Sequence, residues 1–147
     1  MAAANRKNCG NGCGVMSTYE QEELKTVYFE LEIGGFFAGY PRIEVSNEDG
    51  KCAAKYVASY NTGEDDFEIG ITVEEFQKYI HDILASDILK WNEEYVDPDV
   101  LDGTQWTVTI RYSDGQQVKR YGSNAYPPQW KKFMKAVNSI DMLPDLR

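Results

Sequence analysis

Cysteine and histidine, on which metal sites and nucleophilic catalysis most often depend, are scarce here. The chain of 147 residues has three cysteines and one histidine. A structural zinc site needs four ligands, so it would require Cys9, Cys13, Cys52 and His81 together, and the sequence holds no C-x-x-C pair. An odd number of cysteines also argues against a secreted disulfide scaffold. We therefore expect reduced thiols, no metal and no cofactor; the alternatives are a zinc site with three cysteines and one histidine, a redox pair and an intermolecular disulfide.

Long apolar runs are missing too. No stretch approaches the roughly 18 uninterrupted apolar residues of a membrane-spanning helix. In residues 1–16, glycines and asparagines stand where a secretion signal needs an apolar stretch of about 7–15 residues. We predict a cytoplasmic protein without a membrane partner. We expect residues 1–23 to be a flexible leader with an acidic end, and residues 24–147 to form a single domain.

Positively charged residues are also few compared with negatively charged ones. The formal net charge is −9, from 15 Lys and Arg against 24 Asp and Glu. Proteins that bind nucleic acids or anionic membranes directly need a basic face, so we expect neither of these partners. The imbalance is local, because residues 17–104 hold 21 acids and 6 bases, whereas residues 105–147 hold 3 acids and 7 bases. Such a distribution either keeps the protein in solution or attracts a basic partner.

The chain does contain a series of segments in which apolar and polar residues alternate, the pattern of β-strands. In residues 24–33, Phe29 and Leu31 share one face while Glu30 and Glu32 share the other, which predicts a half-buried strand with an acidic outer face. The same alternation predicts further strands at residues 43–45, 51–60, 67–71, 106–112 and up to about 121. Asp-Gly pairs at 49–50 and 114–115 predict tight hairpin turns.

Two segments have the pattern of helices. Thr72 and Glu75 fit a capping box, and apolar residues at helical spacing follow it, so a helix should run over residues 73–86 or extend to residue 90. Pro127 and Pro128 should open the last helix. The element order is β-β-β-(β)-α-β-β-α. It predicts an α+β fold: an antiparallel sheet of about five to six strands with two helices on one face.

Clusters of acidic residues are the main candidate for a functional surface. The residues expected to contact a partner are Glu64, Asp65, Asp66, Glu93, Glu94, Asp97, Asp99 and Asp102. A surface of one sign steers and orients a partner of the other sign. The leading hypothesis is a non-enzymatic binding or regulatory protein that contacts a basic protein. The alternative is an acidic inhibitor, encoded by a phage or mobile element, that imitates nucleic acid and blocks a nucleic-acid-binding defence enzyme.

The sequence gives little sign of catalysis. His81 is the only histidine, it falls within the predicted helix, and no nucleophile motif accompanies it, so we predict no catalytic residues and no enzyme. A third hypothesis is a ligand-binding domain or enzyme that uses the loop 122–127. Ser123, Asn124 and Tyr126 are its candidate contacts, because this loop leads into a helix N-terminus. The competing interpretation is that Ser123 and Asn124 satisfy the backbone groups there.

Four short segments carry a resemblance. W-N-E-E-Y at 91–95, L-D-G-T-Q-W at 101–106, Y-S-D-G at 112–115 and G-S-N-A-Y-P at 122–127 resemble a family of small bacterial (Firmicutes-type) α+β domains of uncharacterised activity, associated with mobile elements. The likeness covers roughly residues 24–140, and G-S-N-A-Y-P is its most specific part. It implies a bacterial α+β domain and transfers no activity. The leader with Cys9 and Cys13 lies outside this pattern.

Overall fold

The computed structural model describes residues 7–9, 12–13, 18–35, 39–59, 63–99 and 103–146. Its strands are β1 (Lys7–Cys9), β2 (Gly12–Cys13), β3 (Thr26–Gly34), β4 (Arg42–Glu48), β5 (Lys51–Val57), β6 (Phe67–Ile71), β7 (Glu94–Val96), β8 (Gln105–Tyr112) and β9 (Gln117–Ser123). Its helices are α1 (Thr18–Lys25), α2 (Val73–Leu84) and α3 (Trp130–Val137), with a 3₁₀ helix at Ile88–Lys90. These elements make an α+β fold, as predicted.

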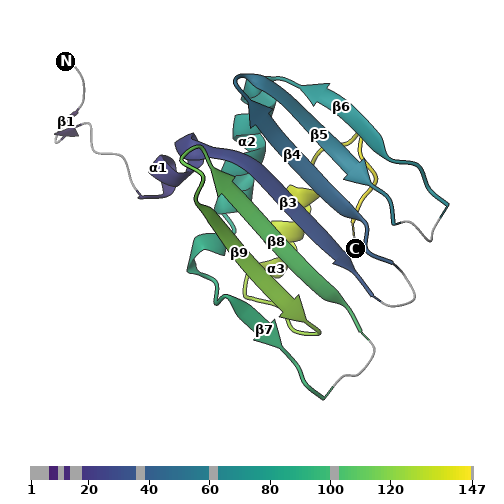
Figure 1. The fold of residues 1–147 in the computed structure, drawn as a ribbon. Helices are drawn as coiled ribbons and strands as arrows, with labels where there is room; N and C mark the ends of the chain where they lie inside the picture. The colour runs from purple at the N-terminus through teal and green to yellow at the C-terminus, as the bar shows by residue number, and fades with distance from the viewer. Residues whose placement is uncertain are drawn as a thin grey trace.

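Seven strands form one sheet in the order β6-β5-β4-β3-β8-β9-β7 (Figure 1). Neighbouring strands are antiparallel except β7, which runs parallel to β9. The sheet is therefore mixed and has seven strands, which corrects the expected antiparallel sheet of five to six. β3 lies at its centre, paired along most of its length with β4 and β8. A separate pair, β1 and β2, lies near the N-terminus.

Helices α2 and α3 lie together behind the sheet in Figure 1, as expected for two helices on one face. The alternation in β3 decides which face they cover: Phe29 and Leu31 are fully buried, while Glu30 and Glu32 point to the opposite face and are half-buried. From α2 and α3, residues such as Ile83 and Phe133 complete this core and are also fully buried. The other sheet face carries no helix in the described part of the chain.

Helix α2 begins as the sequence predicts. The Glu75 backbone N–H donates to Thr72 Oγ1 (3.0 Å), and the Thr72 N–H donates to Glu75 Oε1 (2.9 Å), so the capping box is confirmed. The helix ends at Leu84, two residues before the shorter expected end. Asp87 has a φ of 63°, a left-handed conformation that an α-helix cannot contain, and the chain resumes as the short 3₁₀ helix.

The start of the first long strand differs from the expectation. Leu24 and Lys25, predicted to begin a strand, instead end α1, and the strand starts at Thr26. The boundary expected between residues 23 and 24 thus falls inside α1. This helix packs near α2, where His81 Nδ1 lies 2.8 Å from Glu23 Oε1. Helix α1 is a third helix that the alternation beginning at residue 24 concealed.

Both predicted Asp-Gly turns are present. At the β4–β5 turn, Asp49 and Gly50 have φ values of 53° and 88°, the pair of left-handed conformations that a two-residue hairpin turn uses. At the β8–β9 turn, Gly115 has a φ of 89° and its N–H donates to Tyr112 O (3.0 Å). These turns fix the register of the two hairpins, and with it the face on which each side chain lies.

Candidate functional site

The predicted partner-binding residues do not form one surface. Glu64, Asp65 and Asp66 immediately precede β6, at one edge of the sheet, while Glu93, Glu94, Asp97 and Asp99 surround β7, at the opposite edge. Six strand spacings of about 4.8 Å separate these edges, which places the two clusters roughly 29 Å apart. Asp102 lies outside the described residues. A single contact of ordinary size would therefore engage one cluster or the other.

At the β6 edge, the acidic segment is fastened to β5. Tyr56 donates its hydroxyl proton to Glu64 Oε1 (3.0 Å), and the Ala58 backbone N–H donates to Asp66 Oδ1 (3.0 Å). Burial and the hydrogen bond to Glu64 raise the pKa of Tyr56. Asp65, between the two anchored acids, is exposed. The bonds hold this acidic segment beside the sheet edge.

At the β7 edge, one acidic side chain binds the backbone, and the main-chain groups of two acidic residues bond to β9. Asp97 Oδ1 accepts a bond from the Asp99 N–H (3.1 Å), and the Asp97 N–H donates to Ser123 O (2.9 Å). The Glu93 carbonyl accepts a bond from the Tyr121 N–H (2.9 Å). These contacts extend the pairing of β7 with β9, which itself carries the basic residues Lys119 and Arg120. The β7 cluster thus lies next to positive charge.

The loop 122–127 is held in place by contacts with β8, with the residue before β8 and with α3. Asn124 Oδ1 accepts a bond from the Thr104 N–H (2.8 Å), and Asn124 Nδ2 lies 3.4 Å from Ser123 Oγ. Tyr126 stacks against Trp130 with ring centroids 5.1 Å apart. The Trp106 indole N–H donates to Ala125 O (3.0 Å). The contacts of Ser123, Asn124 and Tyr126 therefore fix the loop to β8 and α3.

Residues 91–95, 103–106 and 122–127 meet at this same corner, whereas residues 112–115 form the β8–β9 turn at the other end of β8. Trp91, Trp106 and Trp130 pack together, with the ring centroids of Trp106 and Trp130 4.7 Å apart. Tyr95 lies against Trp106, and Phe133 against Trp91. Aromatic pairs in such tilted and edge-on arrangements stabilise a fold beyond their buried area. Three of the four segments named in the sequence analysis thus build a structural corner.

The sheet face without helices mixes charges of both signs. Across the strands, Glu30 and Glu44 are paired in register, and Arg42 forms an ion pair with Glu44. The Tyr28 hydroxyl donates a hydrogen bond to Glu30 Oε1 (2.6 Å). The Arg111 guanidinium lies over the Tyr28 ring, with Cζ 4.5 Å from the ring centroid. Such a surface differs from the continuous negative array that imitation of a nucleic-acid backbone would need.

Partial burial on this face has an electrostatic effect. Loss of water around Glu32 raises the pKa of its carboxyl group, the nearby charge of Glu30 raises it further, and Arg42 opposes both. For Tyr28, burial and the bond to Glu30 raise the pKa well above its usual range. Both groups are held in a setting that favours their uncharged forms.

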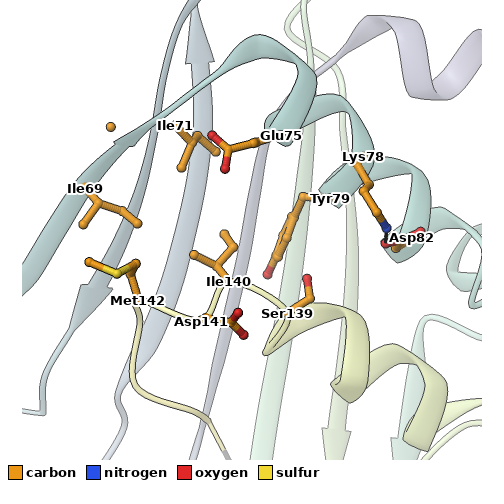
Figure 2. Close-up of a pocket in the computed structure, with 11 residues that line it drawn as sticks. Ile69, Ile71, Glu75, Lys78, Tyr79, Asp82, Ser139, Ile140, Asp141 and Met142 are labelled. Atoms are coloured by element: carbon orange, nitrogen blue, oxygen red, sulfur yellow. Dashed lines mark hydrogen bonds and ion pairs between the residues drawn. The ribbon is translucent and has the colours of Figure 1, made fainter.

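A cavity beside β6 was not foreseen from the sequence. Its volume is about 450 Å³. Figure 2 shows the residues that line it from the edge strand, helix α2 and the segment that follows α3. Ile69 and Ile71 line it from β6, and Ile140 and Met142 line it from the last segment. Its charged residues are Glu75, Lys78, Asp82 and Asp141. Residues of two distant segments, 69–82 and 139–142, form it, so no local pattern could have revealed it.

Within the described ranges, no group of three or more His, Cys, Asp or Glu side chains is placed to hold a metal ion, and no helix is long and apolar enough to cross a membrane. No protein-family model matches the chain, and no curated protein sequence matches it.

Proposed function

We propose that this protein is a non-enzymatic binding protein whose acidic surface around β6 contacts a basic protein partner. The observation that carries the proposal is the charge of residues 63–77. This segment holds six acids and no Lys or Arg. The acids are Glu64, Asp65, Asp66, Glu68, Glu74 and Glu75. All six are exposed: Glu68 lies in the edge strand β6, and the other five lie just before or after it.

The surroundings of β6 favour this edge over the β7 edge. The nearest bases are Lys55, opposite Glu68 in the register, and Lys78, whose charge is paired with Asp82. Each edge strand lies beside a strand with two bases, β5 with Lys51 and Lys55 and β9 with Lys119 and Arg120. Residues 90–99, however, hold four acids together with Lys90, whereas residues 63–77 hold six acids and no base. A surface with an excess of charge of one sign attracts oppositely charged proteins and accelerates their association.

Two triple variants with matched charge test the proposal. Asp65→Asn, Glu68→Gln and Glu74→Gln neutralise exposed acids at β6, while Glu93→Gln, Glu94→Gln and Asp99→Asn do the same at β7. Each raises the formal net charge of −9 by three. The tagged proteins are used to capture partners from extracts of the source organism at low and at high salt. Mass spectrometry then identifies the retained proteins.

The proposal expects the unmodified protein to retain basic proteins at low salt and to release them at high salt, because salt screens exposed charges. The β6 variant should lose most of this binding, and the β7 variant should keep it. Equal binding by both variants and the unmodified protein would overturn the proposal. So would retained proteins that are not basic.

A further inference from the structure

Strand β6 has a free edge. It pairs with β5 on one side, from Phe67 opposite Tyr56 to Ile71 opposite Cys52, and no strand in the described part of the chain pairs with its other side. In an antiparallel pair, alternate residues direct their N–H and C=O groups to the neighbour, so the remaining groups of β6 point outward. Such an edge is a template onto which another strand can add.

The apolar side of β6 is incompletely covered. Phe67, Ile69 and Ile71 lie on the helix side of the sheet, as do their buried partners on β5, yet Phe67 is 42% exposed and the two isoleucines are only partly buried. Beside them is the cavity in Figure 2, whose far wall includes Ile140 and the 67% exposed Met142. A strand added next to β6 would place every second side chain over this cavity.

The opposite side of the same edge is polar and open. Glu68 and Gly70 lie on the sheet face without helices, opposite Lys55 and Ala53 of β5. A Cβ atom built on Gly70 would meet nothing within 4 Å, so side chains of an added strand have room there. Asp65 and Asp66 directly precede β6; Asp66 is bonded to the Ala58 backbone, whereas Glu64 is bonded to the hydroxyl of Tyr56, a residue of the helix side. Basic side chains fit this side.

We propose that β6 binds an extended segment of the basic partner as an added strand, with apolar residues of the segment toward the cavity and basic residues toward Glu68 and the acids before β6. This inference rests on the proposed function and specifies its mode of binding. Backbone hydrogen bonds supply affinity that does not depend on side chains, while the alternation of apolar and basic residues supplies specificity.

Charge argues against a second copy of this chain as the occupant. In a symmetric antiparallel pair centred on Ile69, Glu68 of each copy would face Gly70 of the other, which makes the two Glu68 side chains diagonal neighbours on one face. Each segment 63–77 also brings six acids and no Lys or Arg to the shared edge. An excess of the same charge on both copies opposes their association. A positively charged segment at this edge would instead be attracted by the acids.

The other sheet edge is a poorer template. β7 has three residues, Glu94 to Val96, and Pro98 follows it closely. Short edge strands, charge and proline are the devices that limit strand addition. β6 has five residues, no proline and no lysine. The comparison assigns strand addition to β6.

The test uses the full chain and a fluorescein-labelled peptide, Lys-Val-Lys-Ile-Lys-Val-Lys, with binding followed by fluorescence anisotropy at low salt. Two further peptides carry N-methyl groups, one on the apolar residues and one on the internal lysines. Only one of these sets can point its N–H groups toward β6. Strand addition therefore expects one methylated peptide to bind at least about tenfold more weakly than the parent and the other to bind nearly as well.

A pair of protein variants tests the cavity. Met142→Gln replaces an exposed methionine at the cavity, and Leu24→Gln replaces a residue of similar exposure, 65%, on α1. The first should weaken binding of the peptide several-fold and the second should leave it unchanged. Equal binding by both methylated peptides, or by both variants, would overturn strand addition.

The outcomes separate the two proposals. If the parent and both methylated peptides bind equally well, and the β6 triple variant weakens all three, then the acidic surface binds basic partners through charge alone. The proposed function would then stand while strand addition fails. If neither the peptide nor any basic protein binds at low salt, both proposals fail. A dimer in sedimentation equilibrium that Gly70→Lys dissociates would show that β6 is occupied by a second copy, which also overturns strand addition by a partner.

Discussion

Asn124 and Thr104 form two hydrogen bonds that tie the loop after β9 to the start of β8. Asn124 Oδ1 accepts from the Thr104 N–H (2.8 Å), and the Asn124 N–H donates to the Thr104 carbonyl (2.9 Å). Asn124 also has a φ of 59°, in the left-handed region that asparagine tolerates better than most residues. Both its side chain and its backbone conformation therefore favour asparagine at this position.

Replacement of Asn124 should separate these two contributions. Asn124→Ala removes the side-chain bond and puts a residue with a Cβ into a left-handed conformation, so the free energy of unfolding should fall by about 2–3 kcal/mol. Asn124→Gly loses the bond without the strain and should lose less. Urea denaturation measures both. Equal losses in the two variants would show that the backbone conformation contributes nothing.

Gly122 should not tolerate a side chain. A Cβ atom there would lie 2.0 Å from Trp106 Nε1, and the buried indole is held by its bond to Ala125 O. Gly122→Ala should therefore lower the free energy of unfolding by about 1–3 kcal/mol or more through overpacking. Gly70→Ala is the control, because open space surrounds that position. A similar stability in both variants would contradict the close packing of Trp106 on Gly122.

Burial of Tyr79 should make the protein sensitive to alkali. Its hydroxyl donates to Val137 O (2.8 Å), and burial raises its pKa far above the ordinary 10.0. Because the unfolded chain releases this proton near pH 10 and the folded chain retains it, stability is fully present below pH 10 and falls as the pH rises further.

Urea denaturation from about pH 8 to about pH 11 checks this prediction. Tyr79→Phe should cost about 1 kcal/mol at neutral pH through the lost hydrogen bond, and should show a smaller loss of stability at high pH. Tyr121→Phe is the control, since Tyr121 is 40% exposed. A pH dependence in Tyr79→Phe equal to that of the unmodified protein would exclude Tyr79 as the cause.

Cys52 should be unreactive while the protein is folded. It is buried, and loss of water together with the negative charge of Glu74 raises the pKa of its thiol. The thiolate is the reactive form, so both effects slow its modification. In a Cys9→Ser, Cys13→Ser variant, a thiol reagent should label Cys52 at the rate of unfolding. Rapid labelling without denaturant would show that β6 separates from β5 more easily than the packing implies.

Local patterns predicted much of the fold. The alternation of Phe67, Ile69 and Ile71 identified β6, and the Thr72–Glu75 capping box identified the start of α2, because each signal lies within a few consecutive residues. β7 was missed, since three residues are too few to show a period and its partner β9 lies beyond β8 in the sequence. In α1, the exposed Leu24 gives no apolar stripe to mark a helix.

The candidate site was less predictable than the fold. The acidic runs could be read from the sequence, but the order of strands, which decides that Asp65 and Asp99 lie at opposite sheet edges, depends on pairings between distant segments. The cavity forms because Met142, near the end of the chain, lies beside β6 and lines the same space as Ile69. Composition indicates that an acidic surface exists, whereas its position and its apolar neighbour follow from topology.

The central position of β3 has a consequence for the newly made chain. A nascent chain that extends to residue 99 already contains β3 to β7 and α2, but it lacks β8, which pairs with the second side of β3 from Thr26 to Gly34. Until β8 has been added, β3 is an edge strand whose Phe29, Leu31 and Ile33 have only part of their final packing. At about 5–20 residues per second, this exposure lasts about one to three seconds. During translation, therefore, the strand most in need of protection from aggregation is the one that ends up most enclosed.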